Sequence, residues 1–290
     1  MTDFVLLAGI PAPFTERAGV ALPFAGSICA LSLVQAATVL IPAARELPIL
    51  ARLRSGWWAL IPAASVVGFV FAVNALGGIA DGLAYVALVA VPPLAAVALG
   101  WLVRGARPRW AAVAPLLFAI AWVDRGGLAG QAATVALDVL SCVTLGVLLV
   151  AVTPPRLVKV GILAMAAADA WLVFTNKLTA PNNSLNAVMP PAHLPQLQRV
   201  QLHAAVIGYG DIFIAALLGA LLATERGRQR RAALLAAALA LAWNLLFFGF
   251  YELPATVPIA LTLIALELGG RRARRGLRLA TLQPAKRDRG

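Results

Sequence analysis

The chain has 290 residues, of which 61% are hydrophobic and only 12% are charged, and its formal net charge is +12. Because roughly a quarter of the residues in a soluble domain are charged, this composition excludes an ordinary soluble protein and predicts an all-α polytopic membrane protein. The basic residues cluster at the ends of apolar runs, which argues against nucleic-acid binding. Cys29 and Cys142 lie inside apolar segments, as is typical of small buried residues rather than of a disulfide framework.

Apolar segments that approach the roughly 20 residues of a membrane-spanning helix recur along the chain. They lie at about 18–43, 57–80, 82–103, 109–123, 128–152, 157–175, 203–223, 231–251 and 254–270. These segments predict nine transmembrane helices; the fourth is short and the third carries Pro92-Pro93, so eight is the alternative count. Residues 1–17 contain Asp3 and Glu16 and no basic leader region, so we expect no cleavable signal peptide.

The basic residues predict an orientation for the nine segments. With nine spans, the connections after spans one, three, five and seven share one side with the C-terminus. That side holds Arg45, Arg52, Arg54, Arg104, Arg107, Arg109, Arg156, Lys159, Arg226, Arg228, Arg230, Arg231, Arg271, Arg272, Arg274, Arg275, Arg278, Lys286, Arg287 and Arg289. The opposite side holds only Arg17, Arg125, Lys177 and Arg199. Because basic connections stay in the cytoplasm, we expect the N-terminus outside and the basic tail 271–290 in the cytoplasm.

The longest connection between predicted spans covers residues 176–202 and lies on the outer side. It is polar and holds several prolines and asparagines, which are typical of turns. Its last part, residues 197–202, has two interpretations: a helical extension of span seven or a short strand. We favour the helical extension.

Three acidic residues lie well inside the predicted spans: Asp138 in span five, Asp169 in span six and Asp211 in span seven. An ionised group is costly in hydrocarbon, so an intramembrane acid usually faces a bundle interior and a functional site. At 1.5 Å per helical residue, Asp169 and Asp211 lie roughly 9 and 12 Å from the outer ends of their spans, and Asp138 roughly 15 Å. We therefore expect Asp169 to pair with Asp211, with Asp138 the less favoured partner. Glu267 lies near a span end and is interpreted as interfacial.

A pair of neighbouring carboxyl groups has a specific chemical use. In a medium of low dielectric constant both cannot ionise easily, so one keeps a proton and the pair provides an acid and a base. This suits activation of water against a peptide carbonyl without a metal, a cofactor or a covalent intermediate, and we predict none of the three. His193 and His203 lie in or beside the outer connection without further ligands at metal spacing, and are interpreted as ordinary loop residues.

Two glycines, Gly208 and Gly210, directly precede Asp211. Glycine thins a helix surface and weakens the helix, so another chain could lie against the carboxylate. On the purely structural alternative, the glycines serve helix packing and Asp211 is a structural hydrogen-bonding group.

Three motifs occur in an order that resembles the presenilin and signal peptide peptidase group of intramembrane aspartyl proteases. They are the aspartate of Ala168-Asp169-Ala170 in span six, Gly208-Tyr209-Gly210-Asp211 in span seven, and Leu253-Pro254-Ala255-Thr256, similar to the family's Pro-Ala-Leu element, at the start of span nine. The resemblance covers mainly residues 157–270. The chain departs from the family at Ala168, where tyrosine is usual, and at Thr256, where leucine is usual.

This resemblance implies a presenilin-like bundle that hydrolyses transmembrane or signal-peptide helices within the lipid bilayer. Asp169 and Asp211 would be catalytic, and the substrate would contact Gly208, Tyr209, Gly210, Leu253, Pro254, Ala255 and Thr256. Residues 1–156 would form a scaffold of five helices and residues 157–270 the catalytic helices six to nine. An outer N-terminus resembles the signal peptide peptidase branch.

Other classes of protein fit parts of the pattern. Type IV prepilin peptidases also carry Gly-x-Gly-Asp, and residues 175–181 and 214–219 are similar to their motifs. Those enzymes act at the cytoplasmic face and lack the element at Pro254, although the catalytic pair would be the same. A proton-coupled transporter that uses the same carboxylates and a catalytically silent membrane scaffold are further alternatives.

Overall fold

The computed structural model describes the backbone of residues 14–75, 78–188, 190, 192, 194–248, 250 and 252–282. Side chains are described within residues 23–270, apart from 74–77, 248 and the gaps in those ranges. His193 lies outside the described residues, as does most of the segment on which the signal-peptide expectation rests. The side chains of the basic tail also lie outside them.

The first half of the chain is helical. Its elements are α1 (Phe14–Thr38), α2 (Pro48–Ala51), η1 (Gly56–Leu60), α3 (Ile61–Ala75), α4 (Ile79–Val97), η2 (Ala98–Leu102), η3 (Pro108–Ala112), α5 (Val113–Val123) and α6 (Leu128–Val152). Helix α4 continues through Pro92 and Pro93, so these prolines do not divide the third predicted segment. The short fourth segment is a 3-10 turn, η3, that leads into α5.

The second half adds one small sheet to the helices. Its elements are α7 (Pro155–Phe174), α8 (Thr179–Ala187), β1 (Arg199–Leu202), β2 (Ala205–Gly208), α9 (Tyr209–Leu221), α10 (Arg226–Asn244), η5 (Leu245–Phe248) and α11 (Val257–Leu282). Helix α8 lies inside the 176–202 connection and was not predicted from its proline and asparagine content.

Apolar helices coincide with the predicted segments. Five are long and apolar enough to cross a membrane: Gly56–Val73, Ile79–Leu102, Leu128–Val152, Pro155–Phe174 and Arg226–Phe247. Four shorter apolar helices are Pro23–Thr38, Pro108–Val123, Tyr209–Leu221 and Val257–Gly270. Each predicted apolar segment overlaps one of these helices. The mostly helical fold is therefore confirmed, and nine transmembrane crossings stay a prediction.

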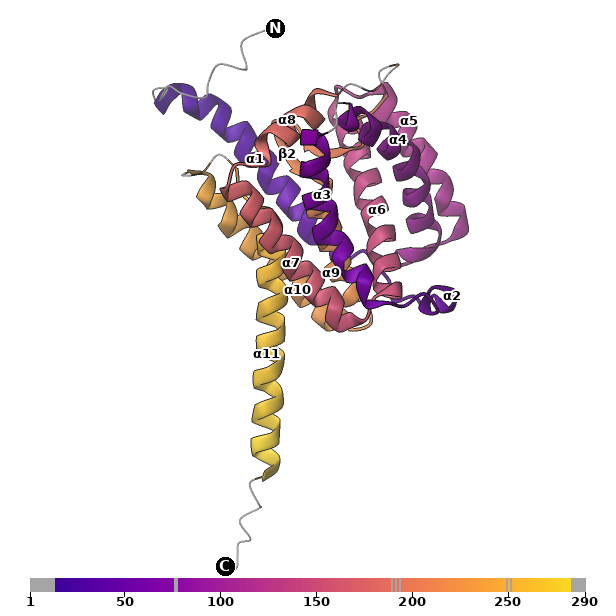
Figure 1. Ribbon diagram of the computed structural model, residues 1–290, viewed down its shortest axis with the longest axis vertical. Helices are drawn as coiled ribbons and strands as arrows, with labels where there is room; N and C mark the ends of the chain where they lie inside the picture. Colours follow the sequence, from indigo (N-terminus) through magenta and orange to yellow (C-terminus); the bar gives the residue numbers. More distant parts are fainter. Residues whose placement is uncertain are drawn as a thin grey trace, which may run out of the picture.

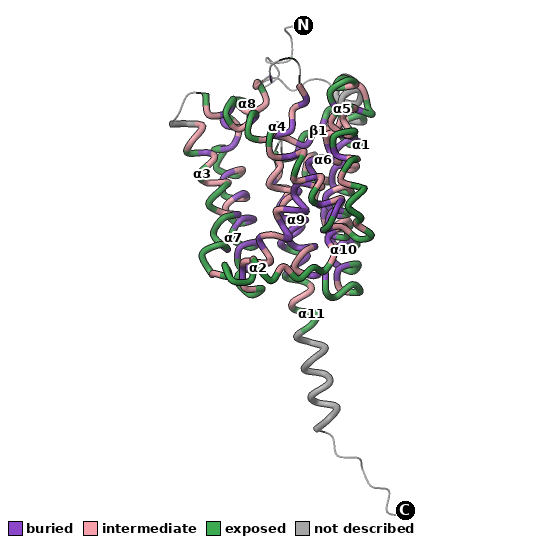
Figure 2. The backbone as a smooth tube through the Cα atoms, turned by 90° about the vertical axis from the view of Figure 1, so that its right-hand side faces the viewer, coloured by how far each residue is buried: buried purple, intermediate pink, exposed green. Residues whose placement is uncertain are grey.

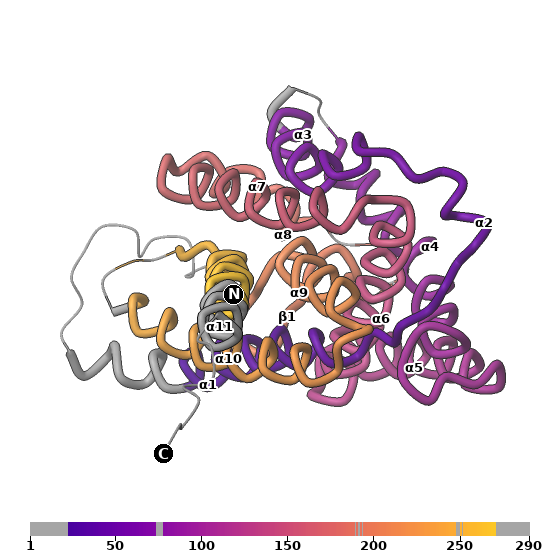
Figure 3. Tube along the Cα trace, turned by 90° about the horizontal axis from the view of Figure 1, so that it is seen from below, coloured from indigo at the N-terminus to yellow at the C-terminus, as the bar shows by residue number. Residues whose placement is uncertain are grey.

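Helix α9 occupies the centre of the bundle (Figure 3) and is its most continuously buried helix (Figure 2). Helices α3 and α7 lie on one side of it, and α1 and α10 lie on the other (Figure 3). Its most extensive contact is with α6. A Cβ atom at Gly146 of α6 would lie 3.0 Å from the main chain of Ala216 in α9. Small residues thus bring the two backbones together, as is common between apolar helices.

Residues 199–208 form an antiparallel hairpin, whose second strand is labelled β2 in Figure 1. Val200 pairs with Ile207. The predicted helical extension is therefore wrong for residues 199–202, and the strand alternative is correct. Val200 and Ile207 are buried while Val206 is 40% exposed, which gives β2 the alternation of a half-buried strand. The two-residue turn has His203 at a φ of 50°, a conformation that a tight hairpin turn requires.

The hairpin changes the expected distance between Asp211 and His203, the residue taken as the start of span seven. Span seven was expected to be helical from His203, but α9 begins at Tyr209 and Asp211 lies in its first turn. A strand rises about 3.3 Å per residue, roughly twice the helical value. The expected depth of 12 Å, which assumed a helix, is therefore wrong.

Candidate functional site

Asp211 is held by the start of its own helix. Its Oδ2 accepts a hydrogen bond of 2.9 Å from the main-chain N–H of Gly208, the N-cap residue of α9. A carboxylate at the third helical position that bonds back to the N-cap N–H is one half of a capping box. The positive end of the helix dipole also favours a negative group there. The Gly-x-Gly-Asp motif thus builds a local environment that offsets part of the cost of burying an acid.

The two glycines of the motif have separate roles. A Cβ atom at Gly208 would lie 3.1 Å from Oδ2 of Asp211, so the glycine keeps this carboxylate unobstructed. A Cβ atom at Gly210 would lie 2.9 Å from the terminal methyl of Met165, where α7 packs against α9. Helix packing, one of the two interpretations offered by the sequence, therefore applies to Gly210, whereas Gly208 leaves room for the carboxylate of Asp211.

Asp169 projects from α7 and is 9% exposed. The hydroxyl of Thr256, which is fully buried, donates a hydrogen bond of 2.6 Å to Asp169 Oδ2. Thr256 precedes the first turn of α11, so this bond ties α11 to α7. Threonine thus occupies the position at which the family resemblance led us to expect leucine. The departure in the third motif is therefore a polar contact to one of the two acids.

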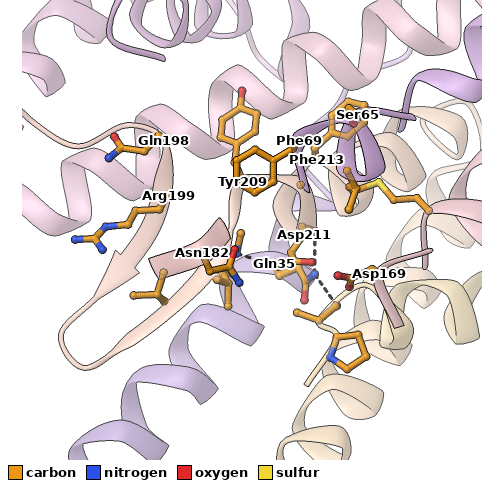
Figure 4. Close-up of a pocket in the computed structure, with 18 of the residues that line it drawn as sticks. Gln35, Ser65, Phe69, Asp169, Asn182, Gln198, Arg199, Tyr209, Asp211 and Phe213 are labelled. Carbon is orange, nitrogen blue, oxygen red and sulfur yellow. Dashed lines mark hydrogen bonds between the residues drawn. The ribbon is translucent and has the colours of Figure 1, made fainter. Parts of the chain in front are cut away.

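Asp169 and Asp211 line one cavity, which has a volume of about 1080 Å³. Figure 4 shows the two carboxyl groups beside one another on its wall. The structure therefore brings together the two acids that the sequence favoured as a pair, from α7 and α9, which are separated by the 176–202 connection.

The remaining predicted site residues surround these acids, with one exception. The cavity is lined by Gly208, Tyr209, Gly210, Leu253, Pro254 and Ala255. Thr256 does not line it and instead contacts Asp169 from behind. Residues 252–254 are non-helical. The family resemblance was the reason for expecting a site beside Pro254.

Gln35 of α1 is a site residue that sequence reasoning missed. Its side-chain amide donates to the main-chain carbonyl of Asp211 at 2.9 Å and to that of Ala255 at 3.0 Å (Figure 4). It therefore joins the start of α9 to the segment before α11, although 176 and 220 residues separate the partners. A glutamine in an otherwise apolar segment was the one available signal.

Two polar side chains, Gln198 and Arg199, line the cavity just before and at the start of β1. Gln198 is 7% exposed, and neither atom of its amide has a hydrogen-bond partner among the described residues. The adjacent Arg199 bonds the main-chain carbonyl of Asn186 at 3.5 Å, and burial lowers the pKa of its guanidinium group. Both residues line the cavity ahead of β2 (Figure 4). The Nε of Arg199, like the amide of Gln198, is buried and has no hydrogen-bond partner among the described residues.

Asp138 lies away from this cavity. It is fully buried in α6, and neither of its carboxyl oxygens has a partner among the described residues. The nearby hydroxyl of Ser141 bonds the main-chain carbonyl of Asp138 at 2.8 Å and the hydroxyl of Tyr209 at 2.7 Å. Asp138 does not line the cavity that holds Asp211.

The other described titratable residues that the sequence analysis named do not line the cavity of Asp169 and Asp211. Glu267 in α11 pairs with Lys159 at 2.8 Å and with Arg228, linking the starts of α7 and α10. His203 is exposed in the hairpin turn, where its main-chain N–H bonds Gln131. Cys29 and Cys142 are free thiols. Among the residues that the structure describes, no group of three or more His, Cys, Asp or Glu side chains is arranged to hold a metal ion.

Comparisons with protein-family models, with curated proteins and with solved structures found no match to this chain. The site must therefore be interpreted from its own geometry.

Proposed function

We propose that this protein is an intramembrane aspartyl protease, in which Asp169 and Asp211 activate a water molecule against a peptide bond of a transmembrane or signal-peptide helix. The observation that carries the proposal is the convergence of these two carboxyl groups in one cavity, next to both a strand and a non-helical segment. The order of the three motifs agrees with it.

The proposal includes a membrane arrangement. Nine apolar helices cross the bilayer, with the N-terminus outside and the C-terminus in the cytoplasm. The distribution of basic residues supports this orientation. Reporter tags at the two ends test it, and we expect only the N-terminal tag to be accessible from outside intact cells. Both tags on one side would exclude an odd number of crossings.

The chemistry needs one proton shared between the two acids. The ionised carboxylate takes a proton from water as the water oxygen attacks the carbonyl carbon, and the protonated acid donates to the carbonyl oxygen. The resulting tetrahedral intermediate then breaks its C–N bond as a proton passes to the leaving nitrogen. The hydrogen bonds from Thr256 and from the N–H of Gly208 hold the two carboxyl groups while the proton moves between them.

A substrate helix must unwind before its amides can be attacked. Strand β2 pairs with β1 on one side only, and Val206, Ile207 and Gly208 line the cavity. An unwound substrate can therefore add to the free edge of β2 through main-chain hydrogen bonds. Asp211 follows Gly208 by three residues in the chain. The unpartnered amide of Gln198 adds a donor and an acceptor that match a peptide group.

Cleavage of a helical peptide by purified protein in detergent tests the proposal. We expect the parent to cut, and Asp169→Asn and Asp211→Asn each to abolish cleavage with unchanged thermal unfolding, because asparagine keeps the shape but cannot carry the charge or exchange the proton. Asp138→Asn is the matched control, because it removes a buried acid outside the cavity, and it should retain cleavage.

Two outcomes would reject the proposal. Retained cleavage in Asp169→Asn or Asp211→Asn, in preparations free of other proteases, would exclude a mechanism based on this pair. Uncut peptides combined with proton-driven solute movement in proteoliposomes would favour the transporter.

A further inference from the structure

A second cavity lies between α1 and α10, on the side of the bundle opposite α3 and α7 (Figure 3). Its volume is about 420 Å³. One wall is formed by Leu33, Ala36 and Ala37 of α1 and by Leu40 just after it, and the other by Arg230, Ala233, Leu234 and Ala237 of α10. Each set has the spacing of a single helix face. We call this cavity the α1–α10 groove.

The walls of the groove are apolar and open to the surroundings. Alanines on both helices leave room between the backbones, while Leu33 and Leu234 are 47% and 74% exposed. A large exposed apolar groove marks a site that another apolar group covers. A hydrocarbon chain fits this description as well as a protein side chain does, so the walls alone do not select an occupant.

The polar end of the groove indicates which kind of occupant binds there. Arg230 closes one end, and Arg226 lies one turn earlier on the same face of α10. Arg104 reaches the same end, because its Nε donates to the main-chain carbonyl of Leu40 at 3.3 Å. Burial lowers the pKa of Arg104, and the charges of Arg226 and Arg230 lower it further. Arg104 and Arg230 therefore lie at the same end of the groove as Leu40, with Arg226 one helical turn from Arg230.

In the described part of the chain, none of the three arginines of this cluster forms an ion pair with an acidic side chain. The ion pairs found there use Lys159 and Arg228, and none uses the three arginines of the groove. The cluster is complementary to an anion. A symmetric dimer built on the same face would bring two such clusters toward each other, which argues against a second copy of the chain as the occupant.

Gln229 fixes the cluster in place. It is 1% exposed, and its amide nitrogen donates to the carbonyls of Val39, Pro42 and Gly219. Its amide oxygen accepts a hydrogen bond from Arg104. One buried side chain thus locks the start of α10 to the end of α1 and holds Arg104 at the mouth of the groove.

We propose that the α1–α10 groove binds an anionic phospholipid, with an acyl chain between the two helices and the headgroup phosphate among Arg104, Arg226 and Arg230. The inference rests on the membrane location proposed above but not on proteolysis. Basic pockets between helices at the cytoplasmic side are a known way of holding anionic headgroups. Each arginine near such a headgroup contributes a factor of about five in affinity.

Native mass spectrometry of the full-length protein in detergent tests the proposal, with titration of phosphatidylglycerol and phosphatidylcholine of identical acyl chains. We expect a preference of at least about 25-fold for phosphatidylglycerol. The double variant Arg226→Gln/Arg230→Gln should lose that preference. The control Arg52→Gln/Arg54→Gln removes the same charge from exposed positions on a different cytoplasmic connection, the one after span one, and should keep it.

A second variant separates the acyl chain from the headgroup. Ala37→Trp fills the groove and should lower the binding of both lipids, whereas Ala25→Trp, an exposed position of the same helix outside the groove, should not. Glycerol 3-phosphate, which carries the headgroup charge without a chain, should fail to compete.

Several results would overturn the proposal. These are equal affinity of the parent for both lipids, an unchanged preference after loss of Arg226 and Arg230, or full competition by glycerol 3-phosphate. Self-association of the parent that Ala37→Trp abolishes, without a change in lipid binding, would identify the groove as a protein interface. None of these results bears on cleavage by Asp169 and Asp211.

Discussion

The protein buries acids in two contrasting environments. Asp169 and Asp211 lie on a cavity wall, and each accepts a hydrogen bond, from Thr256 and from the N–H of Gly208. Asp138 lies between packed helices, and neither oxygen of its carboxyl group has a partner among the described residues. The residue type and the apolar sequence context are the same. The difference is that Asp169 and Asp211 have hydrogen-bond donors and a cavity beside them, and Asp138 has neither among the described residues. An acid needs both in order to react with a bound molecule.

The largest effect should appear when either cavity acid is changed. Loss of one should lower kcat/KM by at least about 10³-fold, the order of magnitude of general acid–base catalysis. The double variant Asp169→Asn/Asp211→Asn should be no slower than either single variant, because the two groups act as one unit. Peptide cleavage by the three variants measures this. Losses that multiply would mean that the acids act independently.

The hydroxyl of Thr256 distinguishes the two environments most directly. Thr256→Val keeps the shape but removes the donor to Asp169, and we expect kcat to fall about 10- to 100-fold, since a hydrogen bond to a charged group contributes about 1.5–3 kcal/mol. Thr256→Ser restores the donor and should recover most of the rate. Equal loss in both variants would assign Thr256 a packing role.

Asp138 should behave in the opposite way. Asp138→Val replaces an unpartnered buried carboxyl group with an apolar side chain of similar size, and should raise the free energy of unfolding by about 1–3 kcal/mol. Cleavage should stay within about twofold of the parent, because Asp138 does not line the cavity. Thermal unfolding in detergent provides the measurement. A less stable, inactive variant would place Asp138 in the functional machinery.

The smallest expected effects are those of alanine substitutions at Gly208 and Gly210, and they should differ between the two positions. Gly208→Ala brings a methyl group to about 3.1 Å from Asp211 Oδ2, and the displaced carboxylate should slow cleavage about three- to tenfold. Gly210→Ala meets only the flexible end of Met165, so kcat should change less than about twofold and α9 should gain helix propensity. The reverse order of effects would show that substrate packing against Gly210 dominates.

Much of this arrangement was predictable from the sequence. Apolar segments of suitable length determine where helices form, because their backbone groups must be satisfied within the segment. The acids stand out inside those segments, and Gly208-Tyr209-Gly210-Asp211 marks a place where the main chain and a carboxylate come close. The two alternatives for residues 197–202 included the correct strand, but local propensity did not decide between them. The strand forms because Val200 and Ile207 are buried together.

Only the tertiary structure decided which acids meet and what holds them. The bonds from Thr256 to Asp169 and from Gln35 to Asp211 and Ala255 join residues 87, 176 and 220 positions apart. No periodicity in the sequence encodes contacts between helices so distant in the chain. The position of Asp138 outside the cavity also depends on contacts between helices that are distant in the chain. Its burial depends on how α6 packs against α9, where Gly146 allows the close approach of Ala216, and the sequence of α6 alone does not indicate which face that contact uses.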